Sequence, residues 1–236
     1  KIRTLAKTIL KDPEEIKIAI SRPPESILQS AFICYDIQKL GILEDLFAKS
    51  RPQRVIIFSS SKLKVKELAF AIKRMKFNVA AMHSDLEQAK REEVMKDFKN
   101  GRIDILVATD IVARGIDIDD IKLVINFDIP HDPEDYVHRI GRTARGTNGE
   151  GLAITFVAEH EQAQFSRIEK FLEKPIYKIP VPAEFGETPA YEPEKHPEGR
   201  GFRRPGGGDK GRTGHGGGNR QGGRSNFRKG PRPANK

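Results

Sequence analysis

The chain's 236 residues are 37% hydrophobic and 32% charged, which is enough for one good core but low for a chain that folds from end to end. The single cysteine, Cys34, excludes a disulfide framework and a CxxC metal site, and no apolar stretch suits a transmembrane helix or a signal peptide, so we expect a cytoplasmic protein without membrane contacts. The formal net charge of +9 is distributed unevenly along the chain.

Residues 1–24 do not fit the pattern of the rest of the chain. Residues 2–10 have helical spacing, residues 15–20 resemble a strand, and prolines follow both stretches. The first residue is Lys1 rather than Met, which hints at a fragment of something longer. We interpret residues 1–24 as the end of a preceding domain followed by a linker, with an arm docked on the same domain as the alternative.

Residues 25–180 alternate between two hydrophobic patterns. Short apolar runs, typical of buried strands, lie at residues 31–35, 54–58, 78–82, 104–108, 123–126 and 152–157. Apolar residues three or four apart predict helices at residues 37–47, 62–75, 88–99 and 159–172. Strand, helix and strand at this spacing imply a parallel sheet with right-handed crossovers. We therefore predict an α/β fold, a three-layer domain whose sheet is flanked by helices.

The end of the chain differs from the rest in composition. Residues 199–236 contain eight Arg and three Lys against the single acid Asp209, 13 glycines and only three hydrophobic residues. Such a segment cannot bury enough apolar area to offset the entropy lost when it orders. We predict a disordered basic tail with a net charge of +10, preceded by a linker at residues 181–198.

Polar strings follow two predicted strands, at the sheet edge where parallel α/β folds bind ligands. The first is Ser59-Ser60-Ser61-Lys62, which suits a phosphate oxygen, although helix N-capping is the simpler interpretation. The second contains a hydroxyl, acids, an arginine and a glycine, namely Thr109, Asp110, Arg114, Gly115 and Asp117. Phosphate and sugar binding explain this second string, and an Asp–Arg pair that stabilises a turn explains it equally well.

The densest polar string, residues 138–146, holds three arginines within seven residues. Arg142 and Arg145 are three apart, so on a helical turn their guanidinium groups would lie on one side. Two cations that face the same way favour a polyanion as counter-charge, whereas a solvated basic face usually contains Glu as well. We therefore favour phosphate binding by this string.

Several catalytic signals are missing from the sequence. No GxxxxGK[ST] string and no Asp-Glu pair after a strand occurs, so these residues have no place of their own to hold Mg-ATP. The six histidines lack metal-ligand spacing, and we expect no metal site. Cys34, in a predicted strand, is expected to be a buried core thiol.

The strings VIIFSSSK, HSDLEQAKR, VATDIVARGID and HRIGRTAR, in this order, resemble motifs IV, IVa, V and VI of the second RecA-like domain of DEAD-box RNA helicases. The resemblance covers about residues 1–180 and implies a RecA-like sheet in residues 25–180. Residues 1–24 resemble the end of the first RecA-like domain, and residues 181–236 are similar to the linker and RNA-binding tail of bacterial members. Ser84 and Ala144 stand where the family usually has Gly.

The resemblance implies a role for each matching position. Arg142 and Arg145 correspond to arginine fingers that reach ATP, and His138 to the network between the two domains. Asp117 corresponds to the acid that contacts the ATP ribose. On the RNA side, the matching positions are Ser59, Arg91, Thr109, Asp110, Arg114 and Gly115. These contacts go mainly to phosphates and 2′-hydroxyls, so RNA binding should be largely independent of sequence.

Together these roles describe the C-terminal part of an ATP-dependent RNA helicase that supplies arginine fingers for ATP hydrolysis and local duplex unwinding. ATP with Mg²⁺ would be held mainly by a first domain outside these residues, so we expect the chain alone to be inactive. Its expected partners are RNA, ATP and RNA-processing or ribosome-assembly complexes. A non-enzymatic RNA-binding or chaperone module and a helicase that acts on DNA remain as alternatives.

Overall fold

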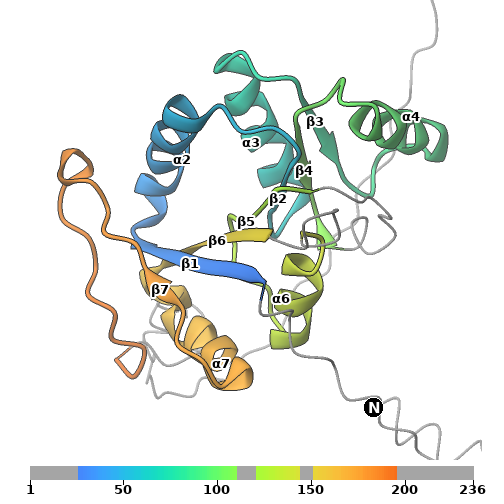
Figure 1. The fold of residues 1–236 in the computed structure, drawn as a ribbon. Coiled ribbons are helices and arrows are strands. Elements are labelled where there is room, and N and C mark those ends of the chain that lie inside the picture. Colours follow the sequence, from blue (N-terminus) through green and yellow to red (C-terminus); the bar gives the residue numbers. More distant parts are fainter. Residues whose placement is uncertain (1–25, 111–120, 144–150, 196–236) are drawn as a thin grey trace, which may run out of the picture. The chain divides into compact units, whose positions relative to one another are not determined.

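The computed structural model describes residues 26–110, 121–143 and 151–195 (Figure 1). The predictions for residues 1–24 and for the tail at 199–236 lie outside this part of the chain. Within it, seven strands form one parallel sheet with the order β3-β4-β2-β5-β6-β1-β7. The strands are β1 (Ile27–Cys34), β2 (Val55–Phe58), β3 (Val79–Met82), β4 (Ile105–Ala108), β5 (Leu123–Asn126), β6 (Gly151–Ala158) and β7 (Tyr177–Lys178).

Helices cover both faces of the sheet and give the predicted three layers (Figure 1). The helices are α2 (Asp36–Ser50), α3 (Lys62–Arg74), α4 (Gln88–Lys99), α6 (Pro133–Ile140), α7 (Gln162–Leu172) and two short 3₁₀ turns, η1 (Glu159–Glu161) and η2 (Ala183–Phe185). Successive strand residues point to opposite faces. Val55 and Ile57 pack with α2 and α3, whereas Ile56 and Phe58 pack with α4. Helices α6 and α7 pack against the β1 and β6 end of the second face.

Strand β1 begins four residues before the predicted start. Gln29 and Ser30 interrupt the apolar run at its beginning, which hid this part from the sequence pattern. Both residues nevertheless pair with β6, Gln29 with Ala153 and Ser30 with Ile154. The side chain of Gln29 accepts a hydrogen bond from the Tyr136 hydroxyl at 3.1 Å, so a polar partner from α6 stabilises this polar strand position.

Part of the segment expected to be a linker lies against the folded domain. The Gln162 side chain of α7 donates to the Ala190 carbonyl at 2.7 Å and accepts from the backbone N–H of Glu192 at 2.7 Å. The Tyr191 ring packs edge-on against Phe165, with ring centroids 6.0 Å apart. Residues up to Lys195 therefore belong to the described fold, because an aromatic contact and backbone bonds hold them on α7.

The lone cysteine is buried, as predicted. Burial raises the pKa of the Cys34 thiol to about 12, so the thiol stays protonated. Among the described residues, no helix has the length and apolar character needed to cross a bilayer.

Candidate nucleotide and nucleic-acid interface

Polar side chains gather at the carboxyl edge of three adjacent strands. Ser59 follows β2, Thr109 follows β4, and Asp128 lies two residues beyond β5. Because β2 lies between β4 and β5 and all three are parallel, these residues meet at the same edge. This edge is where parallel α/β sheets place ligands.

The buried carboxylate of Asp128 organises the centre of the edge. It accepts hydrogen bonds from the Ser59 hydroxyl at 2.7 Å, the Ser60 backbone N–H at 2.8 Å and the Lys64 ammonium at 2.8 Å. Burial alone would raise the pKa of Asp128, but these donors lower it to about 2. The buried Ser59 hydroxyl is thus already committed to Asp128, and an RNA contact from it would require this bond to open.

A second buried charge connects α2 to the ends of β5 and β6. The Lys39 ammonium lies 2.8 Å from Glu161, 3.0 Å from Asp36 and 3.9 Å from Asp128. Burial alone would lower the pKa of Lys39, but the attraction of Glu161 and Asp36 raises it above its ordinary value. Glu161 also accepts from the Ala158 backbone N–H at 2.9 Å, which fixes the chain just after β6.

Arg139, from α6, forms the most heavily bonded group at this edge. Its guanidinium donates to both carboxylate oxygens of Asp110, at 2.5 and 2.8 Å. It also donates to the Asn126 side chain at 3.1 Å and to the Asp128 carbonyl at 2.7 Å. The group lies 5.0 Å from the ring centroid of Phe58 and is 3% exposed. Arg139 therefore connects the segment after β4 with α6 and with the end of β5.

Arg139 was not among the predicted site residues. One predicted explanation of the string that contains Asp110 was an Asp–Arg pair that stabilises a turn. Asp110 does pair with an arginine, but that residue is Arg139 of α6, outside the string, so the turn-stabilising pair stays a prediction. A usable signal was the helical spacing, because Arg139 lies three residues after the buried Tyr136 and so on the same side of α6. Asp128 was also missed, although an acid shortly after a strand is a signal for this edge.

Arg142 lies in a turn rather than on the helical turn that we predicted for Arg142 and Arg145. Helix α6 ends at Ile140, and Thr143 bridges to Ile121, so the chain leaves the helix between these two residues. At Gly141 a Cβ would lie 3.0 Å from the Val137 carbonyl oxygen, a close approach that glycine permits. Arg142 is half-buried, its Nε donates to the His138 carbonyl at 3.3 Å, and the His138 side chain is exposed.

Basic side chains collect beside the outer strand β3. Arg91 of α4 donates to the Ser84 carbonyl at 3.0 Å, while its buried Nε has no hydrogen-bond partner in the described part of the chain. Lys62 and Lys66 of α3 share the Asp85 carboxylate, at 3.0 and 3.4 Å. The end of β3 next to Arg91 therefore has cationic side chains beside it, and one of their donors, the Arg91 Nε, forms no hydrogen bond within the described part of the chain.

The structure brings some predicted residues together and leaves others outside its description. Ser59, Thr109 and Asp110 lie at the carboxyl edge of the sheet, whereas His138 is in the last turn of α6 and Arg142 lies just after that helix, next to Thr143, which pairs with Ile121 before β5. Arg114, Gly115, Asp117 and Arg145 lie outside the described residues, so their roles stay predictions. Ser61 is the N-cap of α3 and accepts from the Lys64 backbone N–H at 3.2 Å, which confirms the capping interpretation for this member of the string.

Comparison with known proteins identifies the family. The model of the helicase conserved C-terminal domain matches residues 38–147. In the crystal structure of the Escherichia coli DEAD-box protein SrmB bound to RraA, the similar SrmB chain is 34% identical to this one, with a TM-score of 0.64, and the match covers 70% of this chain and 98% of that one. The chain belongs to the DEAD-box family. Its described part is the RecA-like helicase C-terminal domain of that family.

Other DEAD-box proteins give the same result. ATP-dependent RNA helicase CshA of Listeria monocytogenes is 38% identical over 182 residues, which cover 77% of this DEAD-box chain and 35% of the relative. The chain therefore spans about a third of the length of that curated relative. Saccharomyces cerevisiae Dbp5, in a structure with RNA and ADP BeF3, is 29% identical with a TM-score of 0.67, over 78% of this chain and 49% of Dbp5.

Metal ligands do not cluster in the described part of this DEAD-box domain. No group of three or more His, Cys, Asp or Glu side chains comes together there in a way that could hold a metal ion. The charged groups at the carboxyl edge are instead paired with one another, as for Asp110 with Arg139 and Lys39 with Glu161.

Proposed function

We propose that this domain is the C-terminal half of an ATP-dependent RNA helicase, in which its carboxyl edge faces RNA and the segment after α6 faces ATP. The observation that carries the proposal is the position of Arg139, which joins Asp110 on the expected RNA side to the helix that precedes Arg142. Relatives named as ATP-dependent RNA helicases, and a similar structure that contains RNA with ADP BeF3, support it.

On the RNA side, the proposal assigns backbone contacts to Arg91, Thr109, Arg114 and Gly115. Lys62, Lys64 and Lys66 begin α3, although cations at a helix N-terminus are unfavourable by about 0.3–1 kcal/mol each. Such a placement is consistent with a positive surface that attracts phosphates. The exposed Ser60 is an additional hydroxyl for a phosphate oxygen, since Ser59 is bonded to Asp128.

On the ATP side, Arg142 and Arg145 act as arginine fingers and Asp117 contacts the ribose. When ATP and Mg²⁺ are bound, mainly by a first RecA-like domain, the nucleotide supplies the γ-phosphoryl group that is transferred to water. The Arg142 guanidinium stabilises the negative charge that develops on that group, an effect worth about 10³–10⁵ in rate for arginine fingers of GTPases. His138, exposed on α6, is assigned to contacts between the two domains.

Arg139 gives these two functions a physical connection. A displacement of Asp110 by RNA moves the carboxylate that holds the Arg139 guanidinium, and Arg142 follows Arg139 by three residues, in the turn just after α6. Closure of two domains around RNA and ATP would complete both sites together. A bent RNA strand cannot remain in a regular duplex, so local duplex opening follows from closure without long translocation.

Two variants of a complete helicase that carries this domain test the proposal. Arg142→Ala should lower the kcat of RNA-stimulated ATP hydrolysis by roughly 10²-fold or more, with RNA affinity much less affected. Arg114→Ala should instead weaken RNA binding on unrelated sequences and lower turnover only through lost RNA stimulation. Arg102→Ala, which removes an exposed arginine just beyond the C-terminal end of α4, is the control. Normal turnover of Arg142→Ala, or ATP-independent duplex opening, would favour a non-enzymatic RNA chaperone.

A further inference from the structure

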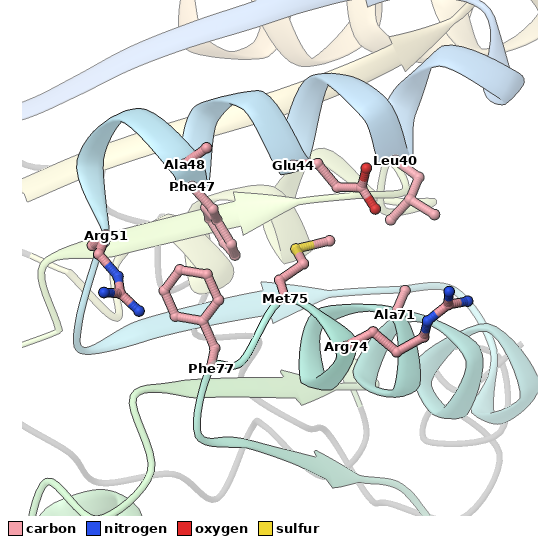
Figure 2. A pocket seen from close by; sticks show the side chains of 9 residues that line it. All are labelled: Leu40, Glu44, Phe47, Ala48, Arg51, Ala71, Arg74, Met75 and Phe77. Carbon is pink, nitrogen blue, oxygen red and sulfur yellow. The ribbon is translucent and has the colours of Figure 1, made fainter.

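A groove separates α2 from α3 at a distance from the carboxyl edge (Figure 2). Its volume is about 730 Å³, and the side chains of Leu40, Phe47, Met75 and Phe77 supply its apolar lining. One end of the groove, on the left in Figure 2, reaches Arg51, just after α2, and Phe77, just before β3. Helices in this fold run opposite to the strands, so the groove opens toward the amino edge of the sheet, and it lies on the face opposite to α6.

The rim of this α2–α3 groove is mainly cationic. Arg51 extends over the Phe77 ring, with 5.8 Å from its guanidinium carbon to the ring centroid, and Arg74 stands at the last turn of α3 (Figure 2). Neither guanidinium forms an ion pair within 4.0 Å among the described residues. Glu44 is the single acid of the lining. An occupant with carboxylates beside an apolar anchor therefore matches the groove in charge and in polarity.

The chain itself shows what kind of segment covers the neighbouring side of α2. Phe185 packs so closely on Gly41 that a Cβ there would lie 3.0 Å from its ring. The Gln38 side chain donates to the carbonyls of Phe185 and Glu187, at 2.8 and 2.9 Å. Phe185 lies between Glu184 and Glu187, so this segment is an aromatic anchor flanked by acids.

We propose that the α2–α3 groove binds a linear acidic segment of a protein partner, with an aromatic side chain inserted against Met75 and Phe77. Carboxylates of that segment pair with Arg51 and Arg74 on the rim. Like the segment that packs beside Gly41, this partner segment has an aromatic residue flanked by acids, but it occupies the adjoining α2–α3 groove. Since the carboxyl edge and the segment after α6 stay open, such a partner binds without displacing RNA or ATP.

A fluorescence anisotropy titration of the full chain tests this docking site. The probe is a fluorescein-labelled peptide made of tandem copies of residues 183–187, and a matched peptide has Ser in place of each Phe. Arg74→Glu removes a rim cation, and Ala48→Trp fills the groove from an exposed position on α2. Each should weaken binding of the first peptide about tenfold. Lys96→Glu, an exposed cation in the last turn of α4, is the matched control and should leave the affinity unchanged.

Melting temperatures equal to that of the parent show that the variants are folded. Equal affinities of the parent and both groove variants would overturn the proposal and assign peptide binding to the basic tail. Equal affinities for the Phe and Ser peptides, or no binding at all, would also overturn it, because no apolar anchor would then be recognised. A dimer in light scattering that Arg74→Glu dissociates would assign the groove to a second copy of the chain instead.

Discussion

Replacement of Arg139 by Met removes the most heavily bonded cation of the carboxyl edge. Breaking a buried ion pair by removing one partner costs about 3–5 kcal/mol. Asp110 is 30% exposed, so its carboxylate regains water and the cost falls toward the lower end of this range. The Asn126 side chain and the Asp128 carbonyl also lose a donor, at roughly 1 kcal/mol each. We expect the unfolding free energy to fall by about 5 kcal/mol, of which about 3 come from the ion pair and about 1 from each of the two other lost hydrogen bonds.

Urea and thermal unfolding of the 236-residue chain, followed by circular dichroism, measure this change. A loss of this size should lower the melting temperature by about 10–20 °C in a domain of this length. Arg139→Lys should cost about half as much, because an ammonium cannot donate to both Asp110 oxygens and both carbonyl groups at once. Arg102→Met is the control, since Arg102 is exposed and its pair with Asp97 should contribute less than about 1 kcal/mol.

The double variant Arg139→Met/Asp110→Asn distinguishes pairing from packing. If the cost comes from an unpaired carboxylate, the double variant should be more stable than the sum of the two single changes implies. An Arg139→Met protein within about 0.5 kcal/mol of the parent would refute the reasoning, because the four hydrogen bonds would then contribute nothing net.

The pKa of Asp128 lies at about 2 in the folded chain, below its ordinary value. The ionised carboxylate therefore adds its full contribution to the unfolding free energy above about pH 4, and this contribution is lost as the pH falls toward 2. Asp128→Asn should therefore lower the unfolding free energy by about 2 kcal/mol at pH 7, with a difference from the parent that shrinks between pH 4 and pH 2 in urea titrations. The purified chain should release no phosphate from ATP above a heat-treated control, because its sequence has no P-loop lysine. Phosphate release above that control would contradict the domain assignment. Deletion of residues 199–236 should leave the melting temperature unchanged but weaken RNA binding, and each lost phosphate contact should flatten the log–log salt slope by about 0.7. An unchanged slope would favour a solubilising tail.

The parallel sheet could be predicted from sequence because its strands are buried on both faces. Strands such as Val55–Phe58 and Ile105–Ala108 therefore appear as uninterrupted apolar runs. Helix α4 was predicted with its exact bounds, since Asn100-Gly101 marks its end and Gly101 has a positive φ of 71°. Strand β7 has no such signal, because two residues carry no periodicity and pairing with β1 alone defines it.

The site was harder to predict, because the sequence shows which polar and charged residues are present but not which of them contact one another. Two arginines of one string have different surroundings. Arg139 is buried and donates four hydrogen bonds, whereas Arg142 lies half-buried in a turn. The spacing along the helix would distinguish the buried Arg139 from the half-buried Arg142, but only if the end of α6 at Ile140 is known. That Asp110 pairs with Arg139 depends on the order of β4, β2 and β5 in the sheet, which no local pattern specifies.

The place of β1 in the sheet determines when this domain can finish folding during synthesis. Its hydrogen-bonded neighbours are β6 and β7, so Ile27 must wait for Gly151, and Ala31 for Lys178, to leave the ribosome. Strands β2, β3 and β4 need no such delay, because their partners all lie within the segment from Val55 to Asn126, and only the second side of β5 waits for β6. Pairing over long sequence separation is slow and leaves an unpaired strand exposed in the meantime. The nascent chain therefore carries an incomplete apolar β1 until the end of the domain emerges, which makes this interval the one in which a chaperone is most useful.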